Sequence, residues 1–157
     1  MPVYILATLD TKGHEAAFVQ QRLQAAGVSA LIVDCGCQGE PTVPASISRE
    51  ELFQAGGASL TELRQKGDRG LAVSTAAQSA AALITALHSQ GQVEGVLGLG
   101  GSAGTTIATT AMRALPLGLP KLMISTLASG QTRPYVGDKD ILMLNSVTDI
   151  LGINRIS

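Results

Sequence analysis

The chain has 157 residues, which is enough for one folded domain with a single core and too few for two domains of ordinary size. Hydrophobic residues make up 45% of the chain and charged residues 15%, which excludes a disordered protein. The net charge of -1 and the 3% of aromatic residues give no reason to expect binding to nucleic acid or to an anionic membrane.

The N-terminus and the cysteines give no sign of export. No charged segment followed by an apolar stretch precedes the first apolar run, and no stretch reaches the roughly 20 apolar residues of a membrane span. Cys35 and Cys37 lie two residues apart, without Cys or His partners at zinc-binding spacing. We therefore expect reduced thiols and a cytoplasmic protein.

Short apolar runs without polar alternation are typical of strands buried on both faces. Five such runs occur, at residues 3–8, 30–33, 96–99, 121–126 and 141–144. The segments between them predict helices or loops. A helix is expected at 14–26, with Gly27 as its C-cap, and residues 35–49 are expected to form a loop.

Further helices are predicted along the rest of the chain. Ser48 and Glu51 have the spacing of a capping box, which predicts a short helix that Gly56 and Gly57 stop. The other expected helical segments are 61–66, 69–89, the residues from the glycine-rich segment to about 115, and a last helix starting at Asp149.

The alternation of strands and helices predicts an α/β fold, with helices on both faces of an open, mostly parallel sheet of about five strands. In such folds ligands bind at the carboxyl ends of the strands, where the strand order reverses. If the order is 2-1-3-4-5, that point lies between the first and third strands. Residues 10–13 and 100–106 would then face the same crevice.

The strongest functional signal is the glycine-rich segment after the third predicted strand. Gly100, Gly101 and Gly104 would let the backbone approach an anion, and the helix that follows offers free N–H groups. The segment also contains three hydroxyl donors, Ser102, Thr105 and Thr106. It suits a phosphate, although it is neither a Walker A motif nor a Rossmann fingerprint. The alternative is a tight strand-to-helix turn.

Polar residues after the first two strands are further binding candidates. Lys12 could neutralise a phosphate, and Asp10 beside Thr11 could hold a metal-bound water or a ribose. These residues could equally be a helix cap and a solvated lysine. Asp34 ends the second strand, where it could bind a ribose or form a turn.

The loop after the fourth strand is a third polar segment at the carboxyl end of a predicted strand. Its residues Ser129 and Gly130 could hold a phosphate or a base, or they could cap their own backbone. No histidine is paired with a nucleophile, and no spaced pair of carboxylates stands out.

An ordered set of segments resembles a known family almost from end to end. These segments are 7–13 with Glu15, 34–36, 68–70, 98–105, 114–121, 125–130, 135–137 and 154–157. The chain is similar to the N-terminal part of the ATP-binding domain family of the tomato mosaic virus resistance protein, which has many uncharacterised bacterial members. It departs from the family at Ala103, where glycine is usual.

The resemblance implies that residues 1–157 form a single Rossmann-like subdomain, the N-terminal portion of a longer two-subdomain protein. It implies a small-molecule nucleotide as the partner, ATP together with Mg²⁺, and a second subdomain that closes over it. Residues 10–12, the glycine-rich segment and residues 129–130 would contact the nucleotide. Two alternatives remain open: an enzyme acting on a phosphorylated or carboxylated metabolite, and a protein-interaction subdomain with a vestigial site. A homo-oligomer is also left open.

Overall fold

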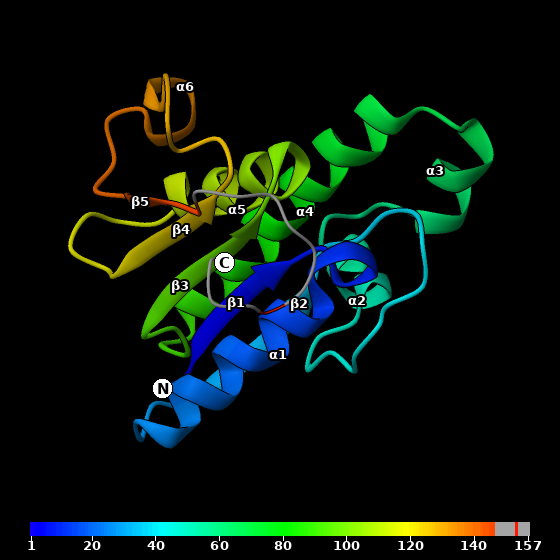
Figure 1. The fold of residues 1–157 in the computed structure, drawn as a ribbon. Helices are drawn as coiled ribbons and strands as arrows, with labels where there is room; N and C mark the ends of the chain where they lie inside the picture. The colour runs from blue at the N-terminus through cyan, green and yellow to red at the C-terminus, as the bar shows by residue number, and fades with distance from the viewer. Residues whose placement is uncertain (147–152, 154–157) are drawn as a thin grey trace.

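The computed structural model describes residues 1–146 and residue 153, and its centre is a parallel β-sheet (Figure 1). Its strands are β1 (Val3–Ala7), β2 (Ala30–Asp34), β3 (Gly95–Gly100), β4 (Lys121–Ser125) and β5 (Leu142–Asn145). The strand order is β2-β1-β3-β4-β5, and every pairing is parallel. The predicted fold class is therefore confirmed, and the strand order is the one assumed in placing the predicted crevice.

Helices cover both faces of this sheet and complete a three-layer α/β/α, Rossmann-like fold. They are α1 (Leu9–Ala25), α2 (Arg49–Ala55), α3 (Leu60–Lys66), α4 (Arg69–Ser89), α5 (Ser102–Arg113) and α6 (Arg133–Val136). Figure 1 shows α1 on one face of the sheet and α4 and α5 on the other. The short helix α6 lies within a segment expected to be a loop. The helix expected to start at Asp149 lies outside the described residues.

The sheet separates two hydrophobic cores. On β1, Tyr4 and Leu6 pack with α2, α4 and α5, whereas Ile5 and Ala7 pack with Ala16 of α1 on the opposite face. Because successive side chains of a strand point to opposite faces, a strand covered on both sides must be apolar throughout. This explains why β1, β2 and β3 show no polar alternation, whereas β5, at the edge of the sheet, is mostly exposed.

Helix α1 begins five residues earlier than the sequence predicts. It starts at Leu9 instead of His14, with a kink at Lys12, where the backbone departs from helical angles. Thr8 stands at the N-cap and provides no side-chain bond, but Asp34 Oδ1 accepts from the Leu9 N–H at 3.2 Å. The helix is therefore capped by a residue of another strand, and residues 10–13 form its first turns.

The local signals at other helix ends are confirmed. Ser48 and Glu51 form the complete capping box of α2. The N–H groups of Gly27 and Val28 bond back to the carbonyls of Gln24 and Leu23, so that α1 ends in a Schellman motif with Gly27 at a φ of 79°. These ends depend only on residues that are near one another in sequence.

Within the described residues, α4 is the one helix that is long and apolar enough, by length and composition, to cross a membrane, contrary to the expectation that no segment is. A core helix passes the same test. Ala76, Ala80 and Ile84 are fully buried in the core that α4 shares with α5 and the sheet. These contacts favour the core assignment.

Candidate functional site

The candidate site lies at the carboxyl ends of β1, β3 and β4. Ala7 at the end of β1 is in register with Leu99 of β3, and Gly100 is in register with Ser125 of β4. The segments that follow these strands therefore leave the sheet at the same end, where the carboxyl ends of the strands lie (Figure 1). Between β1 and β3 the strand order reverses, which is where ligands bind in doubly wound sheets.

The connection from β3 to α5 is shorter than the predicted loop over residues 100–106. Strand β3 runs to Gly100 and α5 begins at Ser102, so that Gly101 is the entire connection. The strand-to-helix turn is therefore tight. A ligand at this place would meet the end of a helix and not the side of a wide loop.

Three glycines beside this turn are explained by packing between the helix and the strand. A Cβ on Gly98 would lie 2.6 Å from Ala108 Cβ, and one on Gly100 would lie 2.7 Å from Gly104 Cα. A Cβ on Gly104 would lie 2.9 Å from the carbonyl oxygen of Leu99. These distances are shorter than real Cβ contacts, so the absence of side chains here is what lets α5 pack closely on β3.

Gly101 is different, because the structure leaves room for a side chain there. An added Cβ would meet only Thr126 Oγ1, at 3.6 Å, and its φ of -81° lies outside the left-handed region that favours glycine. As the N-cap of α5 it offers no side chain to the helix, so the first N–H groups of α5 receive no side-chain cap. Gly101 is thus the glycine of the cluster that packing does not require.

The three predicted hydroxyl donors differ in their surroundings. Thr105 is buried, and its Oγ1 shares a hydrogen bond of 2.6 Å with Ser125 Oγ, which joins α5 to the end of β4. Thr106 Oγ1 donates to the carbonyl oxygen of Ser102 at 3.0 Å. Ser102 is exposed in the first turn of α5. Ser102 is therefore the predicted hydroxyl best placed to meet a ligand.

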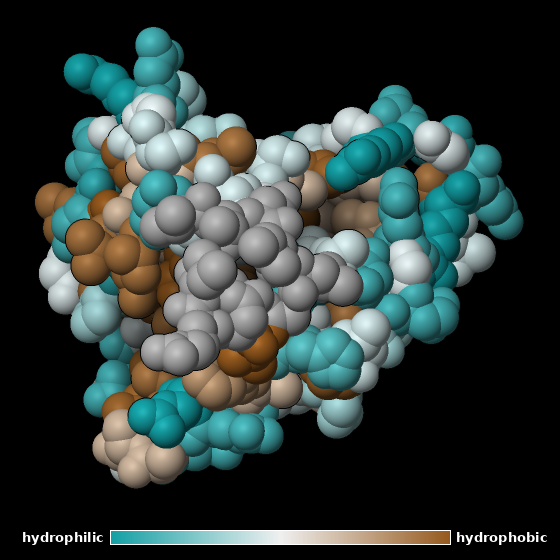
Figure 2. Space-filling model, viewed as in Figure 1, coloured by the Kyte–Doolittle hydropathy of each residue, from teal (hydrophilic) through white to brown (hydrophobic). Residues whose placement is uncertain are grey.

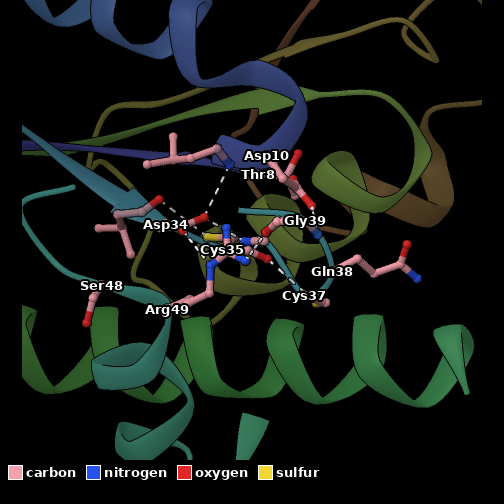
Figure 3. Close-up of polar contacts among 12 residues, drawn as sticks. Thr8, Asp10, Asp34, Cys35, Cys37, Gln38, Gly39, Ser48 and Arg49 are labelled. Atoms are coloured by element: carbon pink, nitrogen blue, oxygen red, sulfur yellow. Dashed lines mark hydrogen bonds and ion pairs between the residues drawn. The ribbon is translucent and has the colours of Figure 1, made fainter. Parts of the chain in front are cut away.

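The residues predicted after β1 lie in the first turn of α1. Asp10 Oδ2 accepts from the Gly39 N–H at 3.1 Å (Figure 3). Thr11 Oγ1 and Thr8 Oγ1 are 2.9 Å apart. Lys12 Nζ lies 3.5 Å from Glu15 Oε1, and both side chains are largely buried. Asp10, Thr11 and Lys12 therefore share one turn at the switch point.

Asp34 is buried and holds the end of β2 in place. Its Oδ2 accepts from Arg49 Nε at 2.7 Å, and its Oδ1 accepts from the N–H groups of Gly36, at 2.8 Å, and Leu9 (Figure 3). Of the two interpretations of Asp34, these contacts favour the turn-forming one.

Arg49 was not among the residues predicted from the sequence. Its side chain is 3% exposed, and Nη1 donates to the Gly39 carbonyl, which brings residues 36–39 around the guanidinium. Its Nη2 is buried and has no partner among the described residues. The ion-pair partner of Arg49 is 15 residues away, so that no local pattern could have revealed it.

The remaining candidates and the cysteines are placed as follows. Ser129 and Gly130 lie exposed in the loop after β4. Both cysteines are free. Burial raises the pKa of Cys37 to about 11, and it raises the pKa of the more deeply buried Cys35 even further. The thiols are therefore protonated at neutral pH and poor nucleophiles.

No group of three or more His, Cys, Asp or Glu side chains that could hold a metal ion occurs among the described residues. Mg²⁺ with a nucleotide does not need such a group, because phosphates and water supply most of its ligands. Asp10 is the carboxylate at the switch point that fits this role. Asp34 does not fit, because Arg49 and two N–H groups already occupy it.

The whole chain matches a family model. Residues 1–157 match the model described as the uncharacterised protein family (UPF0261) N-terminal domain. A UPF0261 protein of Clostridium tetani is 46% identical over 155 residues, which is 99% of this chain and 38% of that protein.

Tomato proteins are also similar. The ToMV resistance protein Tm-1(GCR237) of Solanum lycopersicum is 44% identical over 89 residues, which is 57% of this chain and 12% of the plant protein. The ToMV susceptible protein tm-1(GCR26) is 31% identical over 170 residues, covering 99% of this chain and 22% of that protein. The chain therefore spans well under half the length of these relatives.

Proposed function

We propose that this chain, which belongs to the uncharacterised protein family UPF0261, is an ATP-binding domain. The phosphates would lie at the N-terminus of α5, where its uncapped N–H groups and its helix dipole attract an anion. The observation that carries the proposal is Gly101 at the switch point. It is the N-cap residue of α5 but has no side chain to cap the helix, and packing does not require a glycine there.

The residues around this turn supply complementary groups. Ser102 would donate its hydroxyl to a phosphate oxygen. Asp10 would hold a water of a phosphate-bound Mg²⁺, and Lys12, beside Glu15, would lie on the same side as the phosphates. Mg²⁺ would neutralise the phosphate charge, and the protein residues would orient the phosphates.

Other predicted residues have a supporting place in this proposal. Thr105 holds α5 against the end of β4 through Ser125 and so positions the helix terminus. Ser129 and Gly130, exposed after β4, would reach the ligand from the other side of the turn. Thr106 would contribute through its backbone, since its hydroxyl already donates within the helix.

The proposal is tested by isothermal titration of Mg-ATP into this chain and into the full-length Clostridium tetani relative. Gly101→Val adds a side chain beside the first N–H groups of α5, and we expect it to weaken binding by at least about tenfold, the loss of one charge-assisted hydrogen bond. Gly70→Val, which adds the same side chain at an exposed position in the first turn of α4, is the matched control and should bind normally. Absence of ATP binding in both proteins, or unchanged binding by a folded Gly101→Val variant, would refute the proposal.

The same titration separates the alternative of a phosphorylated metabolite. Inorganic phosphate and a sugar phosphate are titrated beside ATP, ADP and adenosine. A site for ATP binds ATP far more tightly than phosphate alone, because the base and ribose add contacts. Equal affinity for a sugar phosphate would instead support the metabolite enzyme.

A further inference from the structure

A pocket of about 210 Å³ lies beside the carboxyl end of β2, and no residue of the β3–α5 turn lines it. The loop residues Cys37 and Gln38, the end of α3 and the first turn of α4 enclose it. Figure 2 shows a hollow on the side of α3 and α4, with brown residues inside and teal residues at its rim. Drug-sized ligands fill pockets of roughly 300–1,000 Å³, so this pocket suits a smaller molecule.

The floor of the pocket is uncharged. Leu63 and Ala72 line it and are 8% and 7% exposed. Cys37 also lines it, with its thiol directed to the Ala72 carbonyl oxygen at 3.6 Å. Because burial keeps this thiol protonated, with a pKa of about 11, a ligand would meet an apolar floor.

The polar wall of the pocket contains two arginines, Arg64 and Arg69, and one carboxylate, Asp68. Asp68 Oδ1 accepts from the Leu71 N–H at 2.9 Å as the N-cap of α4, so this carboxylate already has a partner. Arg64 clamps the loop, with Nε donating to the Cys37 carbonyl at 3.1 Å and Nη2 to the Gln38 carbonyl at 2.9 Å. Its Nη1 is not used in this clamp.

Arg69 is the arginine of this wall whose guanidinium is available to a ligand. It is the first residue of α4, it is exposed, and it lines the pocket. In the part of the chain that the structure describes, its guanidinium makes no hydrogen bond or ion pair. A planar guanidinium matches a carboxylate or phosphate group with two parallel N–H bonds.

We propose that this pocket binds a small organic anion, with its carboxylate or phosphate on Arg69 and Nη1 of Arg64 and its apolar body on Leu63 and Ala72. Arg64 has a double role, because the bonds that fix residues 37 and 38 also shape the wall of the pocket. None of the residues that line this pocket belongs to the proposed nucleotide site, although Gly39, next to Gln38, donates its N–H to Asp10.

Cys37 reports on occupancy of the pocket. Alkylation of the chain by iodoacetamide at pH 9.5 is followed by mass spectrometry, with the buried Cys35 as the internal control. The probes are succinate and glycerol phosphate, which distinguish the two anion types, and the neutral succinamide is the matched control. We expect at least one anion to slow Cys37 alkylation, by about tenfold at ten times its Kd, and succinamide to have no effect.

Two variants that each remove one positive charge test whether Arg69 binds the anion. Arg69→Gln is expected to weaken the protecting anion by at least about tenfold, the effect of losing a charged hydrogen-bond partner. Lys66→Gln removes the same charge from the last turn of α3, outside the pocket, and should leave protection intact. Gly101→Val should also leave it intact, because that turn belongs to the other site.

Amide shifts in ¹⁵N–¹H spectra give a second measurement that does not depend on the thiol. An anion in the pocket is expected to move the Gly67, Arg69 and Ala72 signals of the unmodified chain. The proposal is overturned if neither anion protects Cys37 or moves these signals. It is also overturned if succinamide protects Cys37 as well as the anions do. Unchanged protection in Arg69→Gln, or lost protection in Gly101→Val, would overturn it too.

Discussion

Asp34 and Arg49 form a buried ion pair, with 2.7 Å between Oδ2 and Nε, that joins the end of β2 to the start of α2. Both side chains are at most 3% exposed. Through Asp34 the pair also holds the first N–H of α1, and through Arg49 it holds Gly39, whose own N–H binds Asp10 (Figure 3). Asp10 at the candidate site is therefore positioned by a network that begins at Arg49.

Removal of Arg49 is expected to destabilise the fold strongly. Arg49→Met leaves the Asp34 carboxylate buried without its cation, and breaking a buried pair in this way costs about 3–5 kcal/mol. Urea unfolding measures the loss. Arg22→Met, an exposed arginine on α1, is the control and should change the free energy of unfolding by less than about 0.5 kcal/mol. Equal effects of the two substitutions would contradict the assigned role of the ion pair.

Neighbouring glycines at the β3–α5 turn are expected to respond differently to alanine. Gly100→Ala places a Cβ 2.7 Å from the backbone of Gly104, and overpacking of this kind costs about 1–3 kcal/mol. Gly101→Ala meets only Thr126 Oγ1 at 3.6 Å and should be tolerated. Thermal unfolding followed by circular dichroism compares the two variants. A larger loss for Gly101→Ala would contradict the packing described for this turn.

The two cysteines are expected to react at different rates and with a strong pH dependence. Since the thiolate is the nucleophile and the pKa of Cys37 is raised to about 11, its alkylation should accelerate about tenfold per pH unit between pH 8 and 10. Cys35 is 1% exposed and should react only after unfolding. Peptide mass spectrometry after timed iodoacetamide treatment resolves the two sites. Fast labelling of Cys35 in the native protein would contradict its burial.

Asp140 is expected to make stability depend on acid pH. Lys121 Nζ, which is fully buried, lies 2.6 Å from Asp140 Oδ1, and this hydrogen bond together with that from the Gly118 N–H lowers the pKa of Asp140 below 3.8. A carboxylate with a lowered folded pKa stabilises the protein above its unfolded pKa. This stabilisation is lost as the pH falls through the folded value.

Thermal unfolding between pH 7 and pH 2.5 checks this contribution. The Asp140→Asn variant should melt at a lower temperature than the parent at pH 7, and the gap should narrow below about pH 4, as the parent's carboxylate is protonated. A gap that stays constant over this range would show that the carboxylate charge is not responsible.

Local patterns in the sequence were sufficient for much of the fold. The capping box of Ser48 and Glu51, the glycine after α1 and the bounds of α4 at Arg69 and Ser89 were predicted correctly. Each depends on backbone groups and side chains within a few residues of one another. The apolar runs also predicted the central strands β1, β2 and β3 correctly, since burial on both faces demands an apolar residue at each position.

Features that join distant segments were decided only by the tertiary structure. Helix α1 begins at Leu9 because Asp34, 25 residues away, accepts its first N–H. Asp34 is occupied because Arg49 reaches it from α2, and Gly98, Gly100 and Gly104 are needed because α5 packs directly on β3. The sequence alone showed which residues are polar or small. The packing of distant elements determined which of them hold the fold together and which, such as Gly101, Ser102 and Arg69, stand open to a ligand.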